Sequence, residues 1–185
     1  MTSVARRGRV ARTLRSPKKS LEGCMFKENP RVYLRSATSE DEAFLLEVYS
    51  STRAEEMALV PWDEAQKQAF LRMQFTAQQD HYRIHYPEAR HDIILSGDEP
   101  VGRLYVDRAQ EEIKILDITV LPRYRGSGIG SSVLHDILAE AKKPGRAVLI
   151  YVETFNPSVR LFERLGFSKI EEDGINSLMR WHPDA

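Results

Sequence analysis

Three glycines and two arginines that stand close together in the chain could bind a phosphate group. Gly126, Gly128 and Gly130 follow Arg123 and Arg125, and an apolar pattern at helical spacing follows the glycines. The first amides of a helix have no backbone partner, and the helix dipole adds partial positive charge beside them. Glycine has no Cβ atom to hold an anion away from those amides, and the arginines add full positive charge. The loop therefore predicts a site for a phosphate or pyrophosphate.

The elements that position this loop follow from hydrophobic periodicity. Residues 113–120 are almost continuously apolar and rich in β-branched side chains, which is typical of a buried strand. Pro122 cannot donate to a sheet, so the strand should end before it. After the loop, apolar residues recur at helical spacing, at Ile129, Val133, Leu134, Ile137, Leu138 and Ala141. The sequence thus predicts a buried strand, a tight loop and a helix.

Two common phosphate loops do not fit these residues. A Walker A loop closes with Lys followed by Ser or Thr, whereas Gly130 is followed by Ser131 and Ser132. A dinucleotide fingerprint would place its last glycine at Ser131, and it needs a further βαβ unit for which too little chain remains. The pattern that remains is Arg/Gln-x-x-Gly-x-Gly/Ala, and residues 125–130 match it.

Two neighbouring segments extend this pattern. Residues 117–122 read Asp-Ile-Thr-Val-x-Pro, and residues 156–167 read Asn-Pro-Ser-Val-Arg-Leu-Phe-Glu-Arg-Leu-Gly-Phe. Together with the loop, they resemble the GNAT superfamily of acetyl-CoA-dependent N-acetyltransferases, over residues 31–181. The resemblance implies a single α/β domain with a mixed, mostly antiparallel sheet. It also implies helices on both faces of the sheet and a central pair of parallel strands that splay apart.

The resemblance further implies where acetyl-CoA would bind as a cosubstrate, without a metal. Its pantetheine arm would pair with backbone groups of the central strand like an added strand, and its pyrophosphate would lie on the loop. The residues assigned to acetyl-CoA are Ile118, Thr119, Val120, Arg125, Gly126, Ser127, Gly128, Ile129, Gly130, Ser131, Asn156 and Phe162.

The reaction expected from the resemblance moves an acetyl group to a primary amine by direct attack in a ternary complex. This agrees with the sequence, in which no Ser-His-Asp or Cys-His set is evident. The amine must lose a proton, so a general base is needed. Asp117 and Glu153 are the candidates because both should lie near the splay. Asp117 could equally make a structural hydrogen bond, and a β-bulge in its strand would change where it points.

One position departs from the family pattern. The family often places a Tyr in the helix after Asn156 to protonate the departing thiolate, and here that position is Phe162. Phe cannot donate a proton, so we predict that it forms a packing wall beside the thioester. An alternative function for the whole chain is an acyl-CoA-binding module without turnover.

Charge divides the chain into two parts. Its 185 residues include 27 Lys or Arg and 27 Asp or Glu, so the formal net charge is zero. Residues 1–27 hold eight basic residues and one acid, which leaves 19 basic and 26 acidic residues, a net charge of −7, in residues 28–185. We predict a disordered basic tail over residues 1–27 and a GNAT-like domain over residues 28–185. A weak nucleic-acid contact, a transit-like leader, or an extension before a second start at Met25 are alternatives for the tail.

Composition also bears on location and partners. Cys24 is the single cysteine and cannot form an internal disulfide, which favours a reducing, cytoplasmic compartment. No apolar run approaches the ~18 residues that a membrane span needs. The expected partner is a small-molecule or peptide amine, and the acidic domain favours a cationic acceptor such as a small amine, a polyamine or a peptide amine. A nucleic-acid partner is not favoured, and a homodimer is compatible with the sequence.

The other elements are predicted from periodicity and capping residues. Strands are expected over residues 31–35, 92–95, 101–106, 147–152, 167–171 and 177–181. A capping box at Ser39 and Glu42 predicts a first helix, and Asp63 caps a second that ends before Pro87. Asn156 should open the last helix.

His81 and His85 lie on the second predicted helix at a spacing that can hold a metal. No third ligand is evident, so a surface pair is the favoured interpretation. In the resembled family, the first two helices line the acceptor site, so the polar and aromatic residues around this pair are expected to contact the acceptor.

Overall fold

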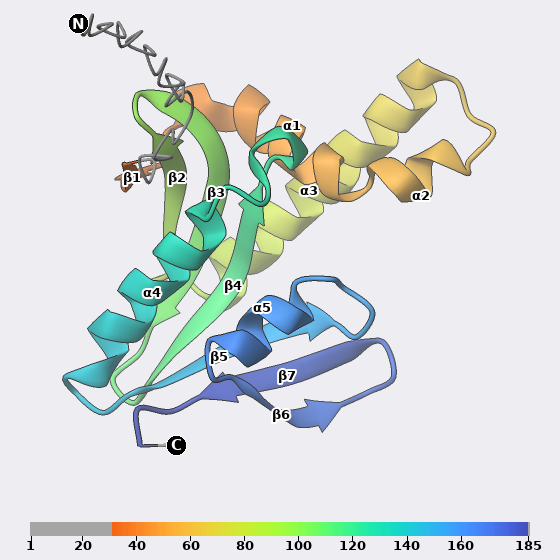
Figure 1. The fold of residues 1–185 in the computed structure, drawn as a ribbon. Helices are drawn as coiled ribbons and strands as arrows, with labels where there is room; N and C mark the ends of the chain where they lie inside the picture. The colour runs from red at the N-terminus through yellow and green to blue at the C-terminus, as the bar shows by residue number, and fades with distance from the viewer. Residues whose placement is uncertain (1–30, 185) are drawn as a thin grey trace, which may run out of the picture.

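A seven-stranded sheet forms the centre of the computed structural model, which describes residues 31–184. The strand order is β1-β2-β3-β4-β5-β7-β6, and every neighbouring pair is antiparallel except β4 and β5 (Figure 1). The strands are β1 (Val32–Ser36), β2 (Arg90–Ser96), β3 (Glu99–Arg108), β4 (Glu112–Val120), β5 (Ala147–Glu153), β6 (Ser168–Glu172) and β7 (Asn176–Trp181). The predicted mixed, mostly antiparallel sheet is confirmed.

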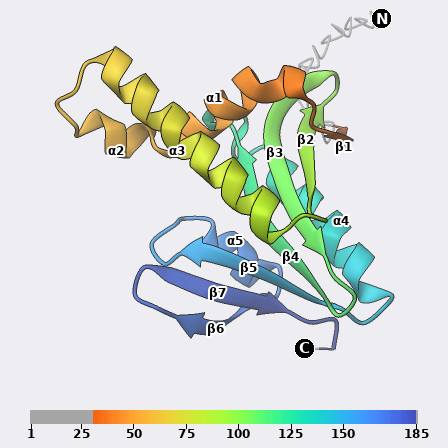
Figure 2. The ribbon, with the colours of Figure 1, turned by 180° about the vertical axis from the view of Figure 1, so that it is seen from behind.

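Helices cover both faces of this sheet, as predicted. α4 and α5 lie on the face toward the viewer in Figure 1, and α1 and α3 lie on the face toward the viewer in Figure 2. These faces are called the α4 face and the α3 face below. The helices are α1 (Glu42–Thr52), α2 (Ala54–Ala58), α3 (Glu64–His85), α4 (Ile129–Lys142) and α5 (Val159–Arg164), with 3-10 turns η1 (Ser39–Asp41) and η2 (Pro122–Tyr124).

The larger apolar core lies on the α4 face. It combines the inward side chains of α4 with alternate residues of the central strands, such as Ile113, Ile115 and Val148. The α4 residues predicted from periodicity are all buried, because each turn directs them onto the sheet. A smaller core on the α3 face gathers Leu45, Tyr49, Leu71, Phe75 and Ile93.

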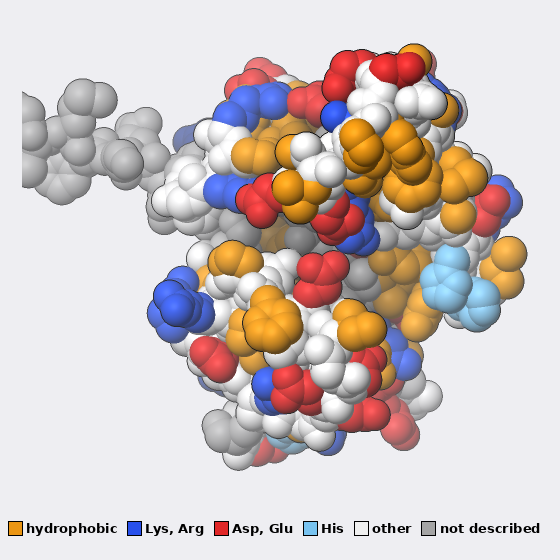
Figure 3. Space-filling model, turned by 90° about the vertical axis from the view of Figure 1, so that its right-hand side faces the viewer, with side chains coloured by type: hydrophobic (Ala, Val, Ile, Leu, Met, Phe, Trp, Pro, Cys, Tyr) orange, Lys and Arg blue, Asp and Glu red, His pale blue; other side chains and the backbone are white. Residues whose placement is uncertain are grey.

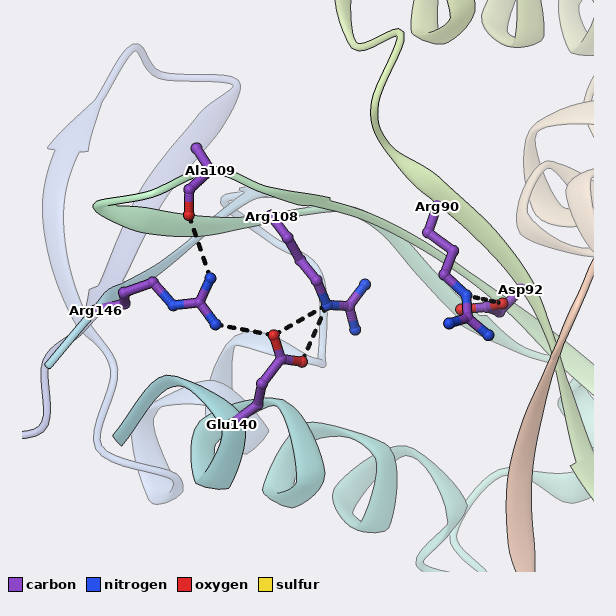
Figure 4. Close-up of polar contacts among 6 residues, drawn as sticks. All are labelled: Arg90, Asp92, Arg108, Ala109, Glu140 and Arg146. Carbon is purple, nitrogen blue, oxygen red and sulfur yellow. Dashed lines mark hydrogen bonds and ion pairs between the residues drawn. The ribbon is translucent and has the colours of Figure 1, made fainter. Parts of the chain in front are cut away.

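Charged side chains fasten the far end of α4 to the sheet (Figure 4). Glu140 accepts from Arg108 of β3 at 3.0 Å and from Arg146 at 2.9 Å, and Arg146 also donates to the Ala109 carbonyl. Two cations on one carboxylate hold the β3–β4 turn and the α4–β5 turn together. This end of the sheet is thus closed, and the opposite end is free to open.

Some boundaries differ from the predictions. The first capping box uses Thr38 and Asp41 in place of Ser39 and Glu42, because a 3-10 turn precedes α1. The Asp63 cap is confirmed, since its carboxylate accepts from the Gln66 amide at 2.8 Å. α2 was not predicted. None of the helices within residues 31–184 combines the length and apolarity needed to cross a bilayer.

The last helix also begins later than predicted, at Val159 instead of Asn156. The Asn156 side chain accepts from the Ser158 amide at 2.9 Å, so this segment forms a turn before the helix. The predicted tail, residues 1–27, and Met25 lie outside the described residues.

Candidate active site

The glycine loop joins β4 to the start of α4. Gly126 and Gly128 have φ of 75° and 89°, a region that favours glycine, and Gly128 forms the N-cap of α4. The first helical bond runs from the Ser132 amide to the Gly128 carbonyl. The preceding amides of α4 therefore have no intrahelical acceptor and can bind an anion. These are the amides of Ile129, Gly130 and Ser131.

The two arginines of the loop are held differently. Arg123 pairs with Glu47 of α1 at 2.9 Å, and its guanidinium lies 5.0 Å from the ring centre of Tyr124. Arg125 donates from Nε to the Val120 carbonyl at 3.0 Å. Within residues 31–184, no carboxylate pairs with Arg125. Of the two arginines, Arg125 is therefore the one whose positive charge is available to bind an anion at the loop. The Ser127 hydroxyl donates to a carbonyl of the same loop at 2.5 Å.

The parallel strands β4 and β5 separate partway along their length. Their pairing covers Glu112–Ile115 against Ala147–Ile150 and goes no further. The predicted splay of the central pair is confirmed. Beyond Ile115, one edge of β4 has no neighbouring strand within residues 31–184, and this free edge leads directly to the glycine loop.

A β-bulge lies where the splay begins. Val106 of β3 pairs with Ile115 and Tyr105 pairs with Asp117, so Leu116 has no partner in β3. Simple alternation would place Asp117 on the same face as Ile115. The extra residue turns Asp117 to the α3 face, as the sequence analysis anticipated for a bulged strand.

The register also fixes which backbone groups face the splay. The Leu121 amide donates to the carbonyl of the residue before Gly102, while Val120 lies opposite Gly102. This makes Val120 a non-hydrogen-bonded position of the ladder, and Ile118 is another. The backbone groups of Ile118 and the Val120 amide therefore point toward the gap beside β5, whereas those of Thr119 pair with β3. The Val120 carbonyl is on the same edge but already accepts from Arg125. Of the three residues assigned to pantetheine, Ile118 thus offers both backbone groups and Val120 offers its amide.

Asp117 lies in a buried polar network on the α3 face. Its carboxylate accepts from Arg103 at 2.5 Å and from the Thr119 hydroxyl at 2.8 Å. Arg103 also donates to Gln78 of α3 at 2.9 Å. The Arg103 side chain is 2% exposed and that of Asp117 is 13% exposed. Both oxygens of Asp117 therefore already accept hydrogen bonds, and the pair links α3 to the strand that lines the splay.

Glu153 is the other candidate base, and its surroundings are more open. It is the last residue of β5, on the far side of the splay from Asp117. Its side chain is 58% exposed, and its only ion-pair partner within residues 31–184 is Arg53 at 3.6 Å. Glu153 thus has a carboxylate that a substrate amine or a water molecule can reach.

Phe162 lies in the core of the α4 face. It is 2% exposed and packs edge-on against Phe167, with ring centres 5.5 Å apart. The ring presents almost no surface to a ligand. This differs from the predicted wall beside the thioester, because α5 directs the ring inward beneath β5.

A cleft of about 430 Å³ opens on the α3 face beside the splay. Leu116, Tyr151 and Leu178 line it from the sheet, and His81 and Tyr82 line it from α3. The Tyr82 hydroxyl donates to the Leu116 carbonyl at 3.1 Å. Burial raises the pKa of Tyr82 well above its ordinary value, so Tyr82 stays protonated and keeps this bond to the bulge.

Sequence reasoning did not identify the Arg103 and Tyr82 contacts. A signal was available for Arg103, because it is a lone charge inside the apolar run of residues 101–106. The stacked rings of His81 and His85 lie on the exposed part of α3, 4.2 Å apart. Within residues 31–184, no group of three potential ligands is positioned to hold a metal.

The surface around the opening carries exposed apolar side chains. Figure 3 shows hydrophobic side chains on both sides of a hollow on this part of the molecule. Leu59 at the end of α2 is 86% exposed, and Phe155 after β5 is 91% exposed. Ile175, in the β6–β7 turn, is 71% exposed. The loops at the open end of the sheet thus offer apolar contacts to a ligand.

Comparison with known proteins agrees with this geometry. Residues 47–167 match the model of the acetyltransferase (GNAT) family. The chain belongs to this family. Its fold is similar to a PaiA N-acetyltransferase from Thermoplasma acidophilum in complex with coenzyme A, with a TM-score of 0.62 and 18% identity. That alignment covers 82% of this chain and 98% of the other.

Two further relatives are ribosomal-protein alanine N-acetyltransferases. The crystal structure of the Escherichia coli enzyme for protein S18 aligns with a TM-score of 0.54 and 16% identity, over 80% of this chain and 90% of that one. A curated Haemophilus influenzae enzyme for protein bS18 is 24% identical over 79 residues, which are 42% of this chain. The match spans about half, 54%, of the length of that curated relative.

The loop of this GNAT domain fits the pyrophosphate of coenzyme A. A Cβ atom built at Gly126, Gly128 or Gly130 would meet nothing within 4 Å, so the space above the loop is open. Free amides, the charge of Arg125 and the free edge of β4 then form one continuous surface. That surface combines hydrogen-bond donors for an anion with backbone groups that can pair like those of a strand. An acyl-CoA needs the first for its pyrophosphate and the second for its pantetheine arm.

Proposed function

We propose that this protein is an acetyl-CoA-dependent N-acetyltransferase that acts on a primary amine. The observation that carries the proposal is the free edge of β4, which runs from the bulge at Leu116 into the glycine loop of α4. One end of that edge suits pantetheine and the other suits a pyrophosphate. Membership of the GNAT family supports the same reaction.

The cofactor site would use backbone groups more than side chains. The backbone groups of Ile118 and the amide of Val120 would pair with pantetheine. The amides of residues 129–131 and the charge of Arg125 would hold the pyrophosphate. Acetyl-CoA supplies an acetyl group activated as a thioester. An amide at the β4 edge can donate to the acyl oxygen as negative charge develops there.

In the proposed reaction, the amine attacks directly in a ternary complex. A nitrogen–carbon bond forms, the carbon–sulfur bond breaks, and the thiolate leaves with its electron pair. Glu153 takes the amine proton, directly or through water, because its carboxylate is exposed at the splay. Asp117 acts by positioning, since Arg103 and Thr119 already occupy its oxygens. With Phe162 buried, solvent protonates the thiolate, whose pKa near 8.5 makes it a tolerable leaving group.

The test is acetyl-CoA-dependent release of free thiol with a panel of primary amines. We expect Glu153→Gln to lower kcat by about a hundredfold, because a positioned base contributes about that much. Affinity for coenzyme A, measured by calorimetry, should not change. Glu163→Gln removes an exposed carboxylate from α5 and is the matched control, with wild-type turnover expected. Full activity in Glu153→Gln would exclude Glu153 as the base.

An acyl-CoA-binding module without turnover is the second candidate. The observation that favours it is the burial of Phe162 where the family often has a Tyr acid. The same assay distinguishes the two functions. Tight coenzyme A binding without thiol release from any amine would support the binding module.

A further inference from the structure

The cleft beside the splay differs in charge from the domain as a whole. Among the residues that line it, the carboxylate is Glu112, and Asp117 and Glu153 lie at the adjoining splay. Glu112 pairs with Lys114 at 2.9 Å within the cleft wall. Asp117 and Glu153 pair with arginines, as described above. The carboxylate that lines the cleft is therefore already paired with a cation.

The walls of the cleft combine apolar and aromatic side chains with the charged pair of Glu112 and Lys114. α3 crosses β3 and β4 and leaves this face of β5 and β7 uncovered (Figure 2). Leu149 and Tyr151 of β5 and Leu178 of β7 point to this side, and Tyr82 and Tyr86 close the cleft from α3. Tyr151 is 67% exposed, although it lies in the middle of a seven-stranded sheet. A large ring left open to solvent at this position is available to pack against a ligand.

We propose that this cleft binds the body of the acceptor, and that the acceptor is a primary amine bearing one aromatic or large apolar group. The inference rests on the proposed function and specifies its substrate class. The amine nitrogen would lie at the splay beside Leu116, and the apolar group would extend between α3 and β5. A polyamine would leave its second ammonium group in this cleft without a free carboxylate partner.

The size of the cleft agrees with such a group. An apolar cavity of about 150 Å³ holds benzene. The cleft of about 430 Å³ is therefore large enough for a phenyl ring together with the short chain that carries the amine. Two sources share this chemistry: a free arylalkylamine and the first residue of a peptide that begins with Phe.

The test compares phenethylamine, a Phe-Ala dipeptide amide, putrescine and spermidine as acceptors for the full-length protein. We expect kcat/KM for at least one aromatic amine to exceed that for both polyamines by about tenfold or more. The reason is that each buried methylene equivalent strengthens binding by about fourfold, and an aromatic ring buries several. Phenethylamine and the dipeptide distinguish a free amine from a peptide terminus. Faster acetylation of either polyamine would overturn the inference while the proposed function stood.

Two variants locate the preference in the cleft. Leu178→Glu places a carboxylate against the apolar group and should lower kcat/KM for the aromatic amine by about tenfold or more. His81→Glu changes an exposed α3 residue with little risk to folding, and should raise kcat/KM for putrescine by about threefold through its second ammonium. Ile170→Glu, on exposed β6, makes the matched change outside the cleft and should alter neither value. An aromatic preference that persists in folded Leu178→Glu and in His81→Glu would contradict the inference.

Direct binding separates this inference from the proposed function. If coenzyme A binds and no amine is acetylated, the proposed function fails. Calorimetry then tests whether the cleft binds aromatic amines. If it does, phenethylamine must still bind more tightly than putrescine and must lose affinity in Leu178→Glu. Equal or weaker binding of phenethylamine would refute the apolar cleft. A dimer that buries the cleft and is dissociated by Leu178→Glu would refute it as well.

Discussion

The two faces of the sheet are built in different ways. The α4 face is a continuous apolar core in which Leu134, Ile137 and Phe162 are almost fully buried. The α3 face has a smaller apolar cluster, and beside it lie the charged groups of Arg103 and Asp117. Burying an ion pair seldom stabilises a protein more than apolar packing of the same volume. The α4 face therefore provides stability, whereas the α3 face keeps polar groups in place next to the opening.

The largest expected effect breaks the buried pair on the α3 face. Arg103→Met leaves the Asp117 carboxylate buried without its cation, and we expect a loss of about 3–5 kcal/mol in the free energy of unfolding. The double variant with Asp117→Leu should recover most of that loss, because it removes the unpaired charge. Urea denaturation of wild type, single and double variants measures both quantities.

A matched experiment on the α4 face sharpens the contrast. Leu134→Ala should cost about 2–5 kcal/mol, because it opens a cavity in an apolar core, and changing another charge should not restore it. If the Arg103→Met and Asp117→Leu double variant were less stable than Arg103→Met alone, the two faces would not differ in the way described here.

The next effect concerns the loop at the rim of the α4 face. Gly128→Asp places a negative charge where the pyrophosphate is proposed to bind, and should weaken coenzyme A binding by about tenfold or more, about 1.4 kcal/mol. Gly174→Asp is the matched control, because Gly174 has a φ of 88° and equally open space, but lies in the β6–β7 turn. Calorimetry on both proteins separates backbone strain from ligand repulsion. Equal affinities in the two variants would rule out the loop as the anion site.

The α3 face should also make stability depend on pH, by at most about 1.4 kcal/mol per pH unit. Burial, followed by the nearby charge of Arg103, lowers the pKa of His91 to about 4. An unfolded His titrates near 6.5, so between about pH 6.5 and pH 4 the unfolded state binds a proton that the folded state does not. Stability should therefore fall as the pH falls through this window, and the loss should level off below about pH 4.

The His91→Phe variant isolates this contribution. It should reduce the slope of unfolding free energy against pH by at most about 1.4 kcal/mol per pH unit, the value for one proton. Urea denaturation at several pH values between 4 and 7 gives the slopes. An unchanged slope in the variant would mean that His91 takes up its proton over the same pH range in the folded and the unfolded protein.

The sequence predicted the α4 face more fully than the α3 face. β4, the loop and α4 are adjacent in the chain, and their apolar residues repeat with the period of each element. The position of α4 and the glycine N-cap could thus be predicted locally. Helix boundaries were less certain, because the side chains of Thr38 and Asn156 form turns that periodicity does not reveal.

The network on the α3 face could not be predicted in the same way. Arg103, Asp117 and Gln78 come from three separate elements, and their contacts depend on how α3 crosses the sheet. The direction of Asp117 also depends on a bulge, and a run of apolar residues does not show where an extra residue lies. Local patterns report which side chains are buried, whereas pairs of charges depend on the assembled fold.

The bulge has a consequence for how this strand tolerates change in its length. Because Leu116 is the residue without a partner in β3, a chain lacking it would keep every other side chain of β4 on its present face. The ladder with β3 would become uninterrupted, and β4 would twist less where it leaves β5. Such a deletion should narrow the opening, and it would remove the carbonyl that accepts from Tyr82. The width of the opening therefore depends on the length of β4, and one residue more or less at Leu116 would change it.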